Sequence, residues 1–360
     1  SKRDFGVDFK KMIIRAKVLS FSLCILFTSP SFAVNDSAIL ADEFPTTLSS
    51  YEFFKDLSRQ IPEDEVIPYN LITVLFTDYA EKNRFVYVPD RKQVRYFEDS
   101  VFNFPVGSAL IKTFSYFNTE ANLEHTNIWI ETRLLLRKKS GWETLVYVWN
   151  NEQTEAYLKL AGKTIYTQFK DLDGNIRNVR YRVPNKNQCK ECHSKDDVVL
   201  PIGPKQRNLN RDFDYSDKTM NQLDKWFESG IINNSMTTIG PVADANNTAD
   251  DIGRRARAYL DINCGHCHSH NGSANSTGLY LDYNVQNAKQ LGVYKSPVAA
   301  GLGSGSLKYS IVPGNPDASI LLFRMTSNNP AIMMPETGRS MVHKEGVALI
   351  REWIQSLENK

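Results

Sequence analysis

The sequence has few cysteines and lacks a long hydrophobic run, and both shortages restrict what the protein can be. Only five of its 360 residues are cysteine. No stretch after the N-terminal segment is apolar and long enough to span a bilayer. Glycine, proline and charged residues occur at ordinary levels, which argues against a disordered or fibrous protein. The hydrophobic content of 41% suffices for a sizeable core and about two domains.

Excess charge of one sign is also missing. The formal net charge is +2, and residues 1–33 contribute +4 of it through six basic and two acidic residues. Without that segment the chain carries a net charge of −2. A basic surface for nucleic acid is therefore not indicated, and we expect no nucleic-acid partner.

The N-terminal segment has the pattern of a secretory signal. Basic residues Arg15 and Lys17 precede a short apolar run from Val18 to Phe27, and Ser31-Phe32-Ala33 has small residues where signal peptidase cuts. We expect residues 1–33 to be the signal peptide, with Met12 as the natural start and residues 1–11 as an over-extended reading frame. Cys24 is then removed with the peptide, and no membrane span remains.

The four remaining cysteines all lie in two pentapeptides of the form C-x-x-C-H. Two cysteines three positions apart can both reach the vinyl groups of one porphyrin, and the adjacent histidine can then bind the iron. This spacing is the signature of covalent haem c attachment. The sequence therefore predicts two haem c groups, and their attachment and iron-binding residues are Cys189, Cys192, His193, Cys264, Cys267 and His268.

Three other uses of paired cysteines fit the sequence less well. Cysteine pairs that share a zinc ion are usually separated by about 15–20 residues, whereas 71 residues separate these two pairs. A redox-active pair needs a thioredoxin-like context, which neither pair has. Ordinary disulfides do not account for the histidine that follows each pair.

A sixth iron ligand can be named for only one of the haems. Met333 and Met334 precede Pro335 at a suitable distance after His268, and methionine–histidine ligation gives an electron-transferring iron with a raised potential. We favour Met334. For the haem at His193 the sequence leaves Met220, Met236, His125 or an open position.

The chain divides by pattern into three segments after the signal peptide. We expect a β-rich domain over residues 44–185, a first haem-bearing segment over 186–243 and a cytochrome c domain with the second haem over 248–360. Strand patterns occur at 84–88, 94–97, 129–136 and 144–149, and Asp173-Gly174 predicts a hairpin turn. Helices are expected at 49–59, from Thr248 to Cys264, after Asn315-Pro316 and over 345–357.

Taken together, these residues resemble an uncharacterised family of periplasmic dihaem c-type cytochromes, and the C-terminal part is similar to class I cytochrome c domains. The resemblance implies haem content and export, and it implies no substrate. It is carried by the following segments: Thr77–Lys82, Phe104–Gly107, Lys112–Phe114, Glu131–Leu135, Tyr147–Asn150, Asn187–His193, Leu200–Gly203, Leu209–Arg211, Ala256–Cys264, Pro297–Ala300, Ile311–Gly314 and Met333–Glu336.

The sequence thus predicts an α+β fold in which a β-rich domain and a haem-bearing segment precede an all-α class I cytochrome c domain. The predicted function is electron transfer in the periplasm of a Gram-negative bacterium, with a periplasmic redox protein or dehydrogenase as partner. Two alternatives stay open. A first haem with an open position would suit a peroxidase-like reductase, and the chain can instead be the cytochrome subunit of a dehydrogenase. Between these interpretations we favour an electron carrier over an enzyme.

Overall fold

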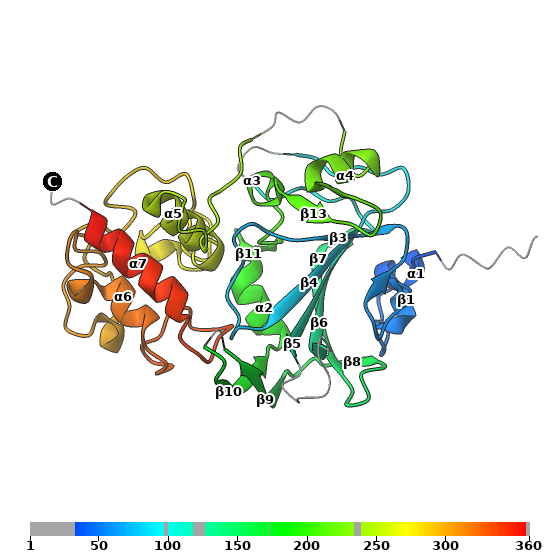
Figure 1. Cartoon of the computed structure of the whole chain (residues 1–360), viewed down its shortest axis with the longest axis horizontal. Helices are drawn as coiled ribbons and strands as arrows, with labels where there is room; N and C mark the ends of the chain where they lie inside the picture. The colour runs from blue at the N-terminus through cyan, green and yellow to red at the C-terminus, as the bar shows by residue number, and fades with distance from the viewer. Residues whose placement is uncertain (1–32, 97–99, 118–126, 172, 234–238, 358–360) are drawn as a thin grey trace, which may run out of the picture. The chain divides into compact units, whose positions relative to one another are not determined.

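A six-stranded antiparallel sheet is the largest element of the structure, which is a computed structural model (Figure 1). It describes residues 33–96, 100–117, 127–171, 173–233 and 239–357. The strands follow each other in chain order: β3 (Val66–Tyr69), β4 (Glu81–Tyr87), β5 (Ala109–Phe117), β6 (Asn127–Lys138), β7 (Gly141–Trp149) and β8 (Ala156–Leu158). Sequential antiparallel pairing needs only short connections, so the order follows from the strand patterns themselves.

The two faces of this sheet are covered by different parts of the chain. One face packs against the N-terminal segment, through side chains such as Ile39, Tyr51 and Phe53. That segment contains α1 (Asp36–Leu40), the 3₁₀ turn Ser49–Tyr51, β1 (Phe54–Asp56) and β2 (Ile61–Pro62). The predicted helix over 49–59 is therefore wrong. The rings of Tyr51 and Phe53 stack with centroids 5.3 Å apart in the core, and this tertiary contact outweighs the local helical pattern.

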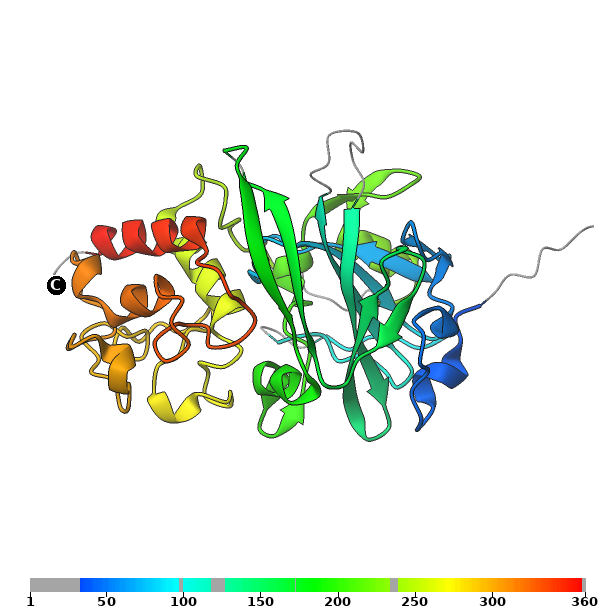
Figure 2. The same cartoon turned by 90° about the horizontal axis from the view of Figure 1, so that it is seen from below.

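The other face of the sheet carries the first pentapeptide. A long hairpin of β9 (Lys163–Lys170) and β10 (Ile176–Val183) precedes α2 (Lys186–His193), and both lie between the sheet and the C-terminal helices (Figures 1 and 2). The predicted hairpin at Asp173-Gly174 is confirmed by pairing of Ile176 with Lys170. The same face is covered by smaller elements: β11 (Ser194–Lys195), β12 (Val198–Val199), α3 (Gln206–Leu209), β13 (Asp212–Asp214), β14 (Thr219–Asn221) and α4 (Gln222–Glu228).

The C-terminal region packs around two helices. α5 (Ile252–Asn263) contacts α7 (Lys344–Ser356), and Tyr259, Leu260 and Trp353 share one apolar cluster. The helix before Cys264 and the C-terminal helix, both expected from the sequence, therefore pack against each other. Gly346 permits it, because a Cβ atom there would overlap the ring of Tyr259.

The predicted fold class is wrong, since this region is not an all-α cytochrome c domain. Its α-helices are α5, the six-residue α6 (Ile320–Met325) and α7, which together make up less than a third of residues 248–357. Most of the remainder is irregular, with 3₁₀ turns at Asn275–Thr277, Gly301–Ser304 and Pro316–Ala318 and with isolated parallel bridges such as Val293 with Ile311. Helical periodicity marked the two long helices but carried no information on the connections between them.

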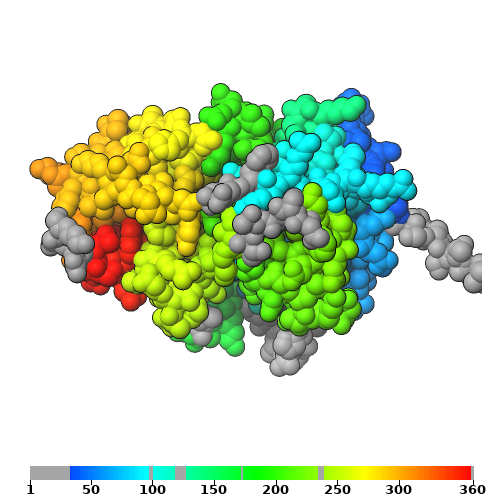
Figure 3. Space-filling model, turned by 90° about the horizontal axis from the view of Figure 1, so that it is seen from above, coloured from blue at the N-terminus to red at the C-terminus, as the bar shows by residue number. Residues whose placement is uncertain are grey.

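The residues from Ala33 onward belong to one compact unit. The surface of the C-terminal region, coloured yellow to red, continues into that of the strand-bearing region (Figure 3). Asp78, in the turn before β4, accepts hydrogen bonds from the backbone N–H groups of Ser340 and Met341 at 2.8 Å and connects the two regions. Among the described residues no helix is both long and apolar enough to cross a bilayer. The expected signal peptide lies outside the described residues, apart from Ala33.

Candidate functional site

Both pentapeptides open onto one cavity of about 540 Å³. One wall is the face of the central sheet, built by β4, β5, β6 and β7. The opposite side is formed by α5, the turn after it and the irregular segment around Met334. The fold therefore brings together two motifs that lie far apart in the chain, and the space between them is enclosed by elements from both regions.

The first pentapeptide forms the last turns of α2. Asn185 caps this helix, because its side chain accepts from the N–H of Gln188 and the Gln188 side chain accepts from the N–H of Asn185. Residues three positions apart lie on one face of a helix, so Cys189 and Cys192 point the same way. Cys189 is buried beside the sheet, while Cys192 lines the cavity more openly.

The second pentapeptide forms a tight turn at the end of α5. Cys264 is the C-terminal cap of that helix, and its carbonyl accepts from the N–H of His268 at 2.8 Å. Gly265 is required here, because a Cβ atom would lie 2.8 Å from the carbonyl oxygen of Asp261. The turn holds Cys264, Cys267 and His268 on the cavity wall.

The two histidines that end the pentapeptides are prepared to bind a metal through Nε2. Nδ1 of His193 donates to the carbonyl of Leu200 at 2.7 Å, and Nδ1 of His268 lies 3.4 Å from Oγ1 of Thr277. A hydrogen bond at Nδ1 fixes the ring and leaves Nε2 as the lone-pair donor. Burial lowers the pKa of each of these imidazoles to about 4, so both are neutral near pH 7.

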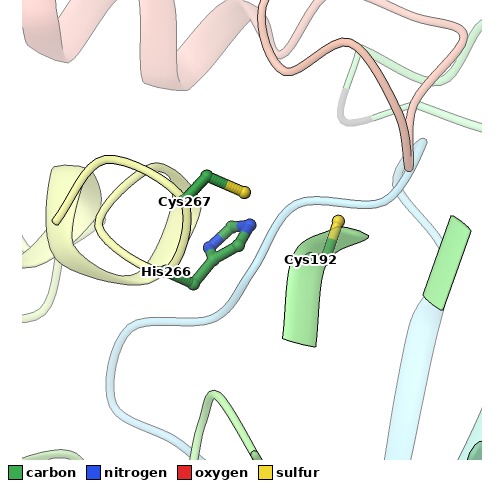
Figure 4. Close-up of side chains that lie close together, drawn as sticks. All are labelled: Cys192, His266 and Cys267. Carbon is green, nitrogen blue, oxygen red and sulfur yellow. The ribbon is translucent and has the colours of Figure 1, made fainter. Parts of the chain in front are cut away.

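The second cysteines of the two pentapeptides nearly meet. The sulfur atoms of Cys192 and Cys267 and a ring nitrogen of His266 all lie within 4.8 Å of one another (Figure 4). Hydrogen bonding by the Cys267 thiol lowers the pKa of Cys192. Three donors this close can also bind a soft metal ion such as zinc. The 71 residues between the two cysteine pairs are therefore no argument against a shared metal ion, because the fold brings Cys192 and Cys267 close together.

Met334 and Met333 are placed differently. Met334 lines the cavity, whereas Met333 is buried outside its lining. The backbone of Met334 is held from both sides, since its N–H donates to the carbonyl of Arg324 at 3.1 Å and its carbonyl accepts from Arg339 at 2.9 Å. The peptide bond between Met334 and Pro335 is cis. Of the two methionines, only Met334 is positioned to reach a group in the cavity.

Of the sequence-derived candidates for the sixth ligand at His193, only Met220 is described by the structure, and it does not line the cavity. Met220 belongs to β14 and packs into the apolar cluster around Trp226, and it is not part of the cavity lining. Met236 and His125 lie outside the described residues.

Sequence reasoning missed a row of cations on the sheet wall. Lys82 and Arg84 on β4, Lys112 on β5 and Arg133 on β6 all line the cavity. Pairing of Arg84 with Lys112, and of Lys112 with Arg133, puts the row side by side across the strands. The sequence does contain a sign of this row. Side chains two residues apart in a strand face the same way, and these charged residues are at even spacing from the apolar Val86 and Leu110.

The chemistry of this lining suits two porphyrins. Of the charged residues in the described lining, eight are cations and two are acids: Lys82, Arg84, Lys112, Arg133, Arg182, Lys295, Arg324 and Arg339 against Glu191 and Glu336. An excess of cations around one cavity favours an anionic occupant. Haem c brings carboxylates, an apolar ring that suits the leucine- and proline-rich remainder of the wall, and an iron for His193 and His268. The donor set therefore fits two covalently attached haems.

In comparisons with known proteins, no family model, no curated protein and no solved structure matches the chain.

Proposed function

We propose that this chain is an exported dihaem c-type cytochrome that passes electrons between periplasmic redox partners. A single observation carries the proposal: two complete C-x-x-C-H pentapeptides open onto one cavity, and the sulfurs of Cys192 and Cys267 lie within 4.8 Å of each other. Thioethers formed at these sulfurs would bring the attached edges of the two haems close together.

The roles of the residues follow from their positions. The four cysteines would hold the haems, and His193 and His268 would bind the irons through Nε2, because their Nδ1 atoms are anchored by other contacts. Met334, which lines the cavity, would be the sixth ligand of the iron at His268. Haem supplies reversible one-electron chemistry. The chain would hold the two groups at a fixed separation, and the apolar part of the cavity wall would exclude water from them.

The test is made on the full chain, expressed with a haem-attachment system. Mass spectrometry of the denatured protein should give two haem additions per chain. After rapid mixing with a substoichiometric reductant, both centres should reach redox equilibrium at a rate that does not depend on protein concentration. Equilibration that slows on dilution shows exchange between molecules and contradicts transfer within the chain.

A second use of the same residues is favoured by one observation. Cys192, His266 and Cys267 form a group of three soft donors, so a structural zinc ion is the competing occupant. Zinc leaves the anchored His193 and His268, the cationic row and most of the cavity without a role. Metal analysis separates the two: one zinc and no iron per chain supports the metal site, and two irons support the cytochrome.

A further inference from the structure

The hairpin of β9 and β10 has two faces of different chemistry. Alternation along the strands puts Phe169, Val179 and Tyr181 on the inner face, and all three are buried. They share one apolar cluster with Cys189, the first cysteine of the first pentapeptide. The hairpin is therefore a single layer of two strands that covers Cys189 with one face and has its other face outward.

The outer face of the hairpin is exposed and cationic. In Figure 2 the hairpin, in green, stands in front of the central sheet. Three of its eight outward residues are cations and none is an acid. Arg180 is paired with Tyr166 across the two strands, and Lys170 with Ile176, so each of these cations lies beside an apolar side chain. The outward residues are Thr164, Tyr166, Gln168 and Lys170 on β9 and Ile176, Asn178, Arg180 and Arg182 on β10.

The positive charge of this face is not neutralised by the rest of the hairpin. Its acids lie at the turn, where Asp171 pairs with Arg177 at 2.7 Å and Asp173 is exposed. Within the described part of the chain no acid forms an ion pair with the three outward cations. The chain after residue 33 has a net charge of −2. The positive face is therefore a local feature and does not follow from a basic composition.

Two large apolar side chains are exposed among these cations. The exposed fraction is 79% for Tyr166 and 58% for Ile176. Interfaces between proteins are enriched in tyrosine and arginine. Attraction to nucleic acid or to an anionic membrane depends mainly on the number of cations, and three are few for either. The composition of the outer face therefore favours a protein partner.

The outer face is also connected to the cavity. Arg182, near the end of β10, is exposed and at the same time part of the cavity lining. The helix that carries the first pentapeptide begins four residues later, at Lys186. The outward surface of the hairpin and the attachment site of the first haem are thus adjacent.

We propose that the outer face of the β9–β10 hairpin is the docking surface for a redox protein with an acidic surface, which exchanges electrons with the haem at His193. The inference rests on the proposed dihaem function and gives that function a class of partner and an entry point. Opposite charges steer the two proteins together and orient them, and Tyr166 and Ile176 supply the apolar contact. A face of this size makes a small interface, which is typical of brief redox encounters.

The test uses the full haem-loaded chain, with flavodoxin as an acidic redox protein. In the reaction one reduced flavodoxin loses one electron and one ferric haem becomes ferrous. At low ionic strength Arg180→Glu should lower the second-order rate constant about fivefold, and added salt should reduce the difference. Arg59→Glu is the matched control, because Arg59 is exposed in the N-terminal segment that covers the other face of the central sheet. It should leave the rate constant nearly unchanged.

Two further measurements separate docking from a general effect of charge. Tyr166→Ser should slow reduction by flavodoxin but not oxidation by hexacyanoferrate(III), a small anion that needs no apolar contact. Carbodiimide treatment with oxidised flavodoxin should join the amine of Lys170 to a flavodoxin carboxylate, which peptide mapping identifies. This second readout does not depend on electron transfer.

Equal rate constants for Arg180→Glu and Arg59→Glu, in chains that carry two haems, overturn the inference and leave the dihaem function standing. The inference is also overturned if the unmodified chain binds phosphatidylglycerol vesicles or duplex DNA through Arg180 while Arg180→Glu leaves the flavodoxin rate unchanged, because the face then serves a membrane or a nucleic acid. Haem additions are counted by mass in every variant. A chain without haem overturns the proposed function and this inference together.

Discussion

The sulfur atoms of Cys192 and Cys267 lie within 4.8 Å of each other, although one belongs to α2 and the other to the turn after α5 (Figure 4). Each is the second cysteine of its pentapeptide. The two pentapeptides are far apart in the chain, but in the fold they meet at these two sulfur atoms and form one site.

The chain without haem should reveal this contact chemically. When it is made without a haem-attachment system and oxidised gently, we expect a disulfide between Cys192 and Cys267, because these two thiols already face each other while Cys189 is buried. Peptide mapping under non-reducing conditions identifies the pair, and Cys192→Ser is the control that removes it. A predominant Cys189–Cys192 bond would show that the two pentapeptides do not meet in this form.

Haem content tests the two pentapeptides separately. The unmodified chain should carry two covalent haems, since each pentapeptide has both cysteines and its histidine. Replacing both Cys264 and Cys267 by alanine should leave one, seen as the loss of one haem mass from the denatured protein. The corresponding variant at Cys189 and Cys192 is the matched control and should also retain one haem. A single addition in the unmodified chain contradicts the dihaem proposal.

The features that sequence could predict are those encoded locally. The stripe of Val347, Ile350 and Ile354 predicted a helix over 345–357, and α7 runs from Lys344 to Ser356. Asp173-Gly174 likewise predicted the turn between β9 and β10. The pentapeptides are local as well, because a few consecutive residues specify the attachment chemistry.

The features that sequence could not predict depend on long-range pairing. That both pentapeptides share a cavity follows only from the packing of α2 and α5 around it. The alignment of Lys112 with Arg84 and Arg133 depends on strand register, and a one-residue slip would turn these side chains to the other face. The prediction at 49–59 failed for the same reason, since Tyr51 is held by a partner distant in the chain, Tyr147.

Met334 and Met333 form an internal control for each other. Met334→Ala should lower the potential of one haem and open its iron to carbon monoxide, because a cavity-lining thioether is lost. Met333→Ala should leave potential and spectrum nearly unchanged while reducing stability, since Met333 is buried outside the lining. Potentiometry with carbon monoxide difference spectra measures both effects. The opposite pattern assigns the ligand to Met333, and no effect from either places the ligand elsewhere.

Asp78 should control how the segment that carries Met334 is held. Its carboxylate accepts from the N–H groups of Ser340 and Met341 and from the hydroxyl of Ser340 at 2.9 Å. Asp78→Ala leaves these partly buried donors without their acceptor and should cost roughly 3 kcal/mol of unfolding free energy. The haem ligated by Met334 should also become partly accessible to carbon monoxide. Asp90→Ala, at an exposed position, is the control and should change neither property.

Asp261 should contribute to the pH dependence of the free energy of unfolding. Its carboxylate accepts from Lys205 at 2.9 Å and from Arg207 at 3.1 Å, which joins α5 to α3. Burial alone would raise the pKa of Asp261, but the charges of Lys205 and Arg207 outweigh it and hold the pKa at about 2. A pKa that is lower in the folded than in the unfolded chain stabilises the fold above the unfolded value of 3.8, and the stabilisation is lost as pH falls toward 2.

Urea unfolding of the haem-loaded protein between pH 2 and 6 should therefore show that the free energy of unfolding falls at the acid end. Protonation of Asp261 should account for roughly 2 kcal/mol of that fall. Asp261→Asn should remove this group's contribution to the pH dependence of the unfolding free energy and lower stability near pH 6, because Lys205 and Arg207 both lose the charge of Asp261. Asp317→Asn is the matched control, since Asp317 also pairs with an arginine, Arg351, but at the exposed surface. It should leave both the slope and the stability near pH 6 close to those of the unmodified chain. If the unfolding free energy of Asp261→Asn falls with acid as steeply as that of the unmodified chain, the contact between α5 and α3 does not depend on this ion pair.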